Sequence, residues 1–148
     1  MLKSISRHIS AELLWVLASM GHGDDLVVVD TNFPSQSVAN QTASGKLIQM
    51  ANLNTPETIR AILSLYPLDS FVEFPVRRME VVGKPNEILE IHKQVQAVVD
   101  EAEGKHWPLG QIERHQFYVE AKKAYAVVRA GEGRPYGCFL LRKGVIFT

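Results

Sequence analysis

The chain has 148 residues, which fits one domain large enough to bury its own hydrophobic core. Its 46% hydrophobic and 22% charged residues are typical of an ordinary globular protein and exclude a disordered or collagen-like chain. The 16 basic and 16 acidic residues give a formal net charge of zero, so the chain lacks the positive charge expected of a nucleic-acid-binding protein.

Cysteine and histidine usage argues against disulfides and metal sites. Cys138 is the one cysteine, which excludes an intramolecular disulfide. Four of the five histidines have no spacing suited to a metal-binding site; they are His8, His92, His106 and His115. The N-terminus MLKSISRHISAELL lacks the apolar segment of a secretory signal, and no run approaches about 18 apolar residues. We therefore expect a cytoplasmic protein with no membrane partner.

Two elements and a loop are predicted in the first third of the chain. Ser10 can cap a helix over residues 11–20, whose apolar residues recur on one face. Residues 26–29, LVVV, are continuously apolar and mostly β-branched, which is typical of a central strand covered on both faces. Asp30 then lies at the carboxyl end of this strand. Residues 31–53 are polar without a sustained period, and we expect a long loop that borders a site.

The rest of the chain alternates between strand and helix patterns. A second helix is predicted with Thr55 as its cap, Pro56 at its first position and Pro67 at its end. The further predicted elements are a strand over 74–82, a helix opened by residues 85–86 and closed by Gly104, a short strand over 111–115, helical turns over 116–124, and strands over 125–131 and 138–147. This alternation predicts a single α/β domain over residues 1–148, with a central, mostly parallel sheet flanked by helices.

The stretch MGHGDDLVVVD, residues 20–30, places His22 between two glycines. Glycines on both sides let the backbone bend sharply, and imidazole exchanges protons near neutral pH. Asp30 stands where open α/β sheets bind their ligands. Two interpretations remain: His22 is an incidental turn residue, or it shares one crevice with Asp30 as half of an active site.

Other polar residues with chemical potential lie in the last third of the chain. Arg114 and Tyr118 are four residues apart, so they share a face of the predicted helical turns. The segment RPYGC, residues 134–138, has the proline and glycine of a turn around Tyr136. Taken alone, Arg114 and Tyr118 are better explained as an ordinary surface arginine and a half-buried tyrosine, and the ring of Tyr136 could simply pack.

Two stretches together resemble a known family. MGHGDDLVVVDTNFP in the first third and IERHQFYVEAKKAYAVVRAGEGRPYGCFLLRKGV in the last third are similar to the signature segments of the D-ribose pyranase and L-fucose mutarotase family. Their order and spacing match, and the likeness covers nearly the whole chain. Phe33 before Pro34, and Arg114 where ribose-type members usually carry histidine, make the sequence more similar to the fucose-type members.

The resemblance implies roles for seven residues: His22 as the proton donor, and as ligands of the sugar Asp30, Arg114, Tyr118, Tyr136, Gly137 and Cys138. Residues 136–138 correspond to a sugar-binding Tyr-x-Asn segment in which Cys138 replaces asparagine. Cysteine cannot reproduce the paired hydrogen bonds of an amide, so this position bears on which sugar is bound.

The implied activity is that of a monosaccharide mutarotase acting on a sugar such as L-fucose. Ring opening needs a proton delivered to the ring oxygen and a proton removed from the anomeric hydroxyl, by Asp30 or by a bound water. The reaction needs neither metal nor cofactor. The resemblance also implies ring-shaped homo-oligomers, often decamers, with sites near subunit boundaries. The alternatives are a non-catalytic monosaccharide-binding or sugar-sensing protein, and a structural subunit with a relic pocket.

Overall fold

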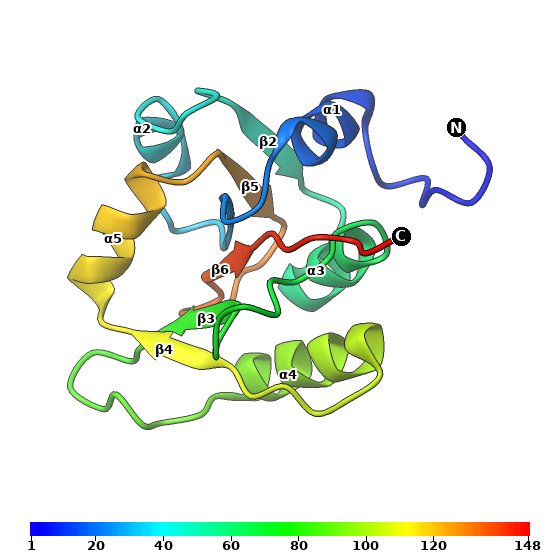
Figure 1. Cartoon of the computed structure of the whole chain (residues 1–148). Helices are drawn as coiled ribbons and strands as arrows, with labels where there is room; N and C mark the ends of the chain where they lie inside the picture. The colour runs from blue at the N-terminus through cyan, green and yellow to red at the C-terminus, as the bar shows by residue number, and fades with distance from the viewer.

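The structure is a computed structural model that describes residues 1–148 and contains five helices and six strands (Figure 1). The helices are α1 (Ala11–Ser19), α2 (Ser35–Ala39), α3 (Thr55–Leu63), α4 (Glu90–Glu103) and α5 (Arg114–Lys122). The strands are β1 (Asp25–Val29), β2 (Leu47–Met50), β3 (Val76–Met79), β4 (Gly110–Ile112), β5 (Ala126–Ala130) and β6 (Phe139–Arg142). None of the helices combines the length and the apolar character needed to cross a membrane.

All six strands join one sheet in the order β2-β5-β1-β6-β3-β4. β1 is parallel to β5, β5 is parallel to β2, and β3 is parallel to β4. β6 alone runs in the opposite direction, between β1 and β3. The prediction of a central, mostly parallel sheet is therefore confirmed, with one reversed strand inserted near its middle.

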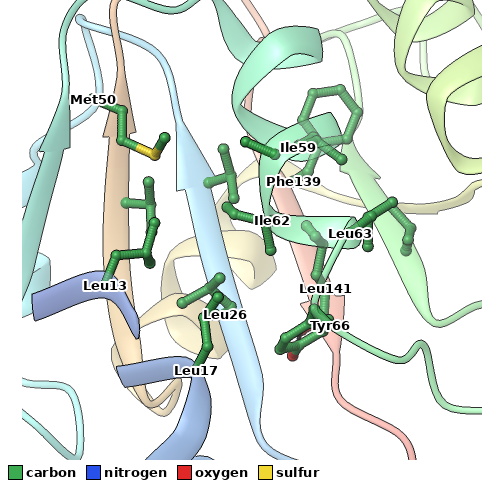
Figure 2. Close-up of a cluster of buried hydrophobic side chains, with 14 of the residues drawn as sticks. Leu13, Leu17, Leu26, Met50, Ile59, Ile62, Leu63, Tyr66, Phe139 and Leu141 are labelled. Atoms are coloured by element: carbon green, nitrogen blue, oxygen red, sulfur yellow. Dashed lines mark hydrogen bonds between the residues drawn. The ribbon is translucent and has the colours of Figure 1, made fainter. Parts of the chain in front are cut away.

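Helices cover both faces of the sheet and form two separate apolar layers (Figure 1). The side chains of Leu26 and Val28 pack with α1, α3 and α4, whereas those of Val27 and Val29 pack with α2 and α5. Figure 2 shows the first layer, in which side chains of α1, β1, α3 and β6 meet. The continuously apolar run thus predicts correctly a strand buried on both faces, and each fully buried side chain contributes about 1.5–3 kcal/mol.

The helix starts follow local capping. The Ser10 side chain accepts a hydrogen bond of 3.1 Å from the Leu13 amide, so α1 begins where the sequence predicts. The cap of α3 is Asn54 and not Thr55, which corrects the prediction by one residue. Asn54 and Glu57 exchange side-chain-to-backbone hydrogen bonds of 3.0 and 2.9 Å, and this reciprocal pair decides the start of the helix.

Two later helices also begin at different residues from those predicted. α4 begins at Glu90 and not near residue 85, because the Leu89 amide donates to Nδ1 of His92 at the first turn. It ends as predicted at Gly104, which adopts a left-handed φ of 67°. α5 begins at Arg114, two residues earlier than predicted, because the Glu113 side chain accepts from two amides of its first turn.

The prediction of a long loop over residues 31–53 is wrong. This segment contains α2 and the edge strand β2, which pairs with β5. Both elements have at most five residues, too few for a hydrophobic period to show in the sequence. Pairing with β5 and packing against the sheet therefore determine them. The strands predicted over 74–82, 111–115 and 138–147 form only in part, as β3, β4 and β6.

Gly131, directly after β5, provides a test of this packing. Its amide donates to the carbonyls of Met50 and Leu53, and a Cβ on it would overlap the Ala51 carbonyl. We expect Gly131→Ala to lower the free energy of unfolding by about 1–3 kcal/mol. Gly133→Ala is the matched control, because its Cβ would meet no atom within 4 Å. Equal urea midpoints for the two variants would contradict this packing.

Candidate functional site

A pocket of about 360 Å³ opens beside the carboxyl end of β1. Its wall comes from the turn after β1, from β3, from α5 and from the segment before β6; the lining residues are Asp30, Asn32, Phe33, Met79, Arg114, Tyr118, Pro135, Tyr136 and Cys138. Five of the seven residues singled out in the sequence therefore meet in one pocket. Gly137, the sixth, contacts the pocket residue Asp30 through its amide.

The buried carboxylate of Asp30 organises this pocket. Its Oδ1 accepts hydrogen bonds from the amides of Asn32 and Phe33, at 3.0 and 3.1 Å. Its Oδ2 accepts from the Gly137 amide at 3.2 Å and from the Cys138 thiol at 3.4 Å. Because a carboxylate offers about four acceptor positions, these donors use nearly all of its capacity. Asp30 thus joins the turn after β1 to the segment before β6.

The thiol of Cys138 is the weakest of the four donors to Asp30. Burial, with the negative charge of Asp30, raises the pKa of the Cys138 thiol well above its ordinary value, so the group keeps its proton. A thiol is a poor hydrogen-bond donor, and its contact with Asp30 is the longest of the set. A ligand hydroxyl can therefore replace this contact at smaller cost than any of the three amide contacts.

Helix α5 provides the aromatic and cationic wall of the pocket. Arg114 lies at its first residue and Tyr118 one turn later, so both face the same side, as their spacing predicts. The ring of Tyr118 stacks on Phe33 with centroids 5.3 Å apart. The Arg114 guanidinium lies 5.7 Å from the centroid of the same ring. This wall combines a flat apolar surface with a charged donor group.

Tyr136 adopts a left-handed backbone conformation, with φ of 60°. This conformation is uncommon for a residue other than glycine and occurs often at functional sites. Its hydroxyl accepts from the Val82 amide at 3.2 Å, and its carbonyl accepts from Nε2 of His92 at 3.2 Å. The tyrosine is thus held at both ends where it lines the pocket.

His22 lies outside this pocket, at the opposite edge of the sheet. It precedes β1, whereas Asp30 follows β1, and the five residues of that strand alone span roughly 16 Å. The neighbouring Gly23 amide donates to the carbonyl of Lys143, just after β6. The expectation that His22 and Asp30 face one crevice is therefore wrong within a single chain. The two residues lie at opposite ends of β1, and so at opposite ends of the sheet along the strand direction.

His22 forms a pair with Asp69, which the sequence does not reveal. Its Nε2 lies 3.0 Å from Oδ1 of Asp69, which also accepts from the Phe71 amide. Burial raises the pKa of Asp69, but the hydrogen bonds from Phe71 and His22 outweigh this effect and hold the pKa below the ordinary value. The ionised carboxylate fixes the imidazole, whose Nδ1 makes no hydrogen bond within the chain. Such a pair is suited to proton transfer.

Exposed apolar side chains surround this pair. Phe71 is 68% exposed, and Ile146 and Phe147 are 72% and 77% exposed. The ring of Phe71 lies 5.3 Å from the imidazole of His22 and 6.4 Å from the ring of Phe147, between centroids. Neighbouring exposed apolar side chains mark surfaces that bind other molecules. We name Phe71, Ile146 and Phe147 the apolar patch.

The pocket and the histidine pair have different chemical capacities. The pocket presents a carboxylate, a guanidinium, tyrosine side chains and stacked rings, which suits a small neutral molecule with several hydroxyl groups. The pair of His22 and Asp69 can exchange a proton. The structure brings together no group of three or more His, Cys, Asp or Glu side chains that could hold a metal ion.

Comparison with protein families matches residues 3–146 to the RbsD / FucU transport protein family. The chain belongs to this family. Human fucose mutarotase is 40% identical over 148 residues, which cover 98% of this chain and 94% of that protein. The fucose mutarotase of Streptococcus pneumoniae, solved in complex with L-fucose, is 38% identical with a TM-score of 0.87, covering 99% and 100% of the two chains. Protein Atu2016 is 50% identical with a TM-score of 0.97, covering 99% and 97%.

The pairing of Asp69 with His22 predicts a pH-dependent stability. Because the folded pKa of Asp69 lies below its ordinary value of 3.8, the ionised carboxylate stabilises the fold above that pH. This contribution is lost as the pH falls through the folded pKa. Asp69→Asn should therefore lower the free energy of unfolding by roughly 1–2 kcal/mol at neutral pH. The difference from the native protein should shrink in acid.

Urea unfolding at several pH values measures this difference. Glu101→Gln is the control, because Glu101 is exposed and pairs with Arg60 at the surface, where ion pairs contribute little. A destabilisation by Asp69→Asn that is independent of pH would show that the carboxylate charge has no such role.

Proposed function

We propose that the protein is a sugar mutarotase, an isomerase that interconverts the anomers of a monosaccharide such as L-fucose. The observation that carries this proposal is the pocket that unites Asp30, Arg114, Tyr118, Tyr136 and Cys138 in a member of the RbsD / FucU family. The fucose mutarotases at 38–40% identity over nearly the full chain support the reaction and the class of sugar.

Each pocket group has a part in binding the sugar. Arg114 donates hydrogen bonds to sugar oxygens, and the hydroxyls of Tyr118 and Tyr136 fix further positions. Asp30 accepts from one sugar hydroxyl, which takes the place of the Cys138 thiol at Oδ2. The rings of Phe33 and Tyr118 cover the apolar face of the sugar. These contacts hold the anomeric carbon and the ring oxygen at a defined place.

The reaction moves protons and the electron pair of one bond. His22 donates a proton to the ring oxygen while the anomeric hydroxyl loses its proton, and the bond between the anomeric carbon and the ring oxygen breaks. The free aldehyde rotates, and the ring closes on its other face as both proton transfers reverse. We assign removal of the hydroxyl proton to a water molecule, because three backbone amides and the bound sugar hydroxyl occupy the acceptor positions of Asp30. No step requires a metal or a cofactor.

A complete site requires two copies of the chain. His22 and the pocket lie at opposite edges of one sheet, so we propose that His22 of one copy reaches the pocket of its neighbour. The apolar patch around His22 supports this proposal, because contact with a second copy would bury it. The arrangement is a ring-shaped homo-oligomer, with a decamer as the expected size. The balanced charge leaves little repulsion between copies.

Removal of the imidazole tests the proposed acid. We expect His22→Ala to lower the rate of L-fucose anomer exchange by about 10²- to 10⁴-fold, the usual contribution of one positioned acid or base. Exchange NMR at equilibrium measures this rate directly. Binding of the sugar should persist, because the pocket residues are unchanged.

His106→Ala serves as the control for this measurement. His106 is exposed and pairs with Asp100 much as His22 pairs with Asp69, but it does not line the pocket and makes no contact with Asp69. The control should keep the native exchange rate. An unchanged rate in His22→Ala would refute the assignment of the acid.

Mixed oligomers test whether the site is shared between copies. His22→Ala and Arg114→Ala should each be nearly inactive alone, since every site lacks one group. When the two variants are unfolded and refolded together, a site that draws on two chains recovers about a quarter of native activity, because random assembly gives that share of intact sites. A mixture as inactive as its components would place both groups of each site in one chain.

Cys138 favours a second function, a non-catalytic monosaccharide-binding protein. Its thiol stands where the family segment carries asparagine, which weakens the polar contacts available to a sugar. Such a protein would bind reducing sugars without accelerating their anomer exchange. The exchange measurement on a panel of sugars, combined with equilibrium binding, separates this function from the mutarotase.

A further inference from the structure

A second cavity, of about 310 Å³, lies on the face of the sheet that α4 covers. α4 and the residue Ile88 before it form one wall, and β3 with the chain around β4 forms the other. Its lining residues are Arg78, Ile88, His92, Lys93, Gln96, Pro108, Leu109 and Gln111. None of them lines the sugar pocket, so the two cavities are separate sites.

Arg78 is a buried cation that forms no ion pair. Arg78 is 2% exposed, and no carboxylate lies within ion-pair distance of its guanidinium group. Nη2 donates both hydrogen bonds of the side chain, to the Pro85 carbonyl at 2.9 Å and to Oε1 of Gln111 at 3.0 Å. Nη1 is buried and has no partner. An isolated buried charge is unfavourable, so an anion in the cavity would stabilise this arrangement.

The rest of the lining adds positive charge and no acid. Lys93 is exposed at the mouth of the cavity and pairs with no carboxylate. The His92 imidazole accepts from the Leu89 amide and donates to the Tyr136 carbonyl, and burial lowers its pKa. His92 is therefore neutral. Glu80 does not line the cavity; its carboxylate accepts a hydrogen bond of 3.3 Å from Nε2 of Gln111. Burial lowers the pKa of Arg78, and the charge of Glu80 partly opposes this effect from beyond ion-pair distance.

We propose that this cavity binds a phosphate-type oxyanion between Arg78 and Lys93. Two cations match the charge of a phosphate, which is close to two at neutral pH. Nη1 of Arg78 has two N–H groups free to donate to phosphate oxygens, and the ammonium group of Lys93 adds a point charge. The volume lies at the small end of ligand pockets and suits inorganic phosphate or a small phosphate monoester. The sugar reaction plays no part in this inference.

Equilibrium dialysis against radiolabelled inorganic phosphate, at constant ionic strength, tests the site in the native protein. We expect saturable binding of a single phosphate per chain. Lys93→Glu should weaken this binding on the order of tenfold or more, since it replaces a cation by an anion at an exposed position that does not support the fold. Lys3→Glu is the matched control, because Lys3 is exposed in the N-terminal segment and does not line the cavity.

A second variant addresses the buried cation. Arg78→Met should abolish phosphate binding while circular dichroism shows a folded chain. Should that variant fail to fold, Lys93→Glu alone decides. Glycerol phosphate added as a competitor shows whether the natural ligand is inorganic phosphate or a phosphate monoester. A site for a monoester binds glycerol phosphate at least as tightly as inorganic phosphate. The absence of saturable binding, or equal binding by Lys93→Glu and Lys3→Glu, would overturn the proposal and leave the mutarotase proposal unaffected.

Discussion

The carboxylate of Asp30 joins parts of the chain that are far apart in sequence. Two of its hydrogen bonds hold the turn that places Phe33, and the other two hold Gly137 and Cys138 more than a hundred residues later. Phe33 in turn supports the ring of Tyr118 on α5. Each buried donor left without an acceptor costs about 1–3 kcal/mol. The pocket therefore depends on one acceptor group that satisfies four donors at once.

Elements with a local signal could be predicted from the sequence, whereas elements defined by pairing could not. Ser10 marks the start of α1, the run Leu26 to Val29 identifies the central strand, and Gly104 ends α4, because each signal lies within a few residues. β2 has no such signal, since its partner β5 lies about eighty residues later. The reversal of β6 is also absent from the local pattern, because direction in a sheet is a property of the whole topology.

Some residues of the candidate site could also be predicted from the sequence, whereas others are found only in the folded chain. The resemblance of two segments singles out Asp30, Arg114, Tyr118, Tyr136 and Cys138, and these residues do meet in the pocket. Asp69 could not be found in this way. It stands in a turn after α3, 47 positions from His22, and only the folded chain shows that its carboxylate holds the imidazole. The position of His22 relative to Asp30 follows from strand direction and not from their short separation in sequence.

The position of β1 between His22 and Asp30 has a consequence for assembly. His22 precedes this strand and Asp30 follows it, so the two halves of the proposed site lie at opposite ends of the strand and on different surfaces of each copy. In the proposed ring this contact is heterologous, and every copy offers one unsatisfied half to the next. Repetition of this contact closes into a ring only when the rotation between neighbours divides a full turn evenly; any other rotation produces an open filament. The angle between neighbouring copies is thus as much a requirement for a closed set of the proposed sites as the residues that line them.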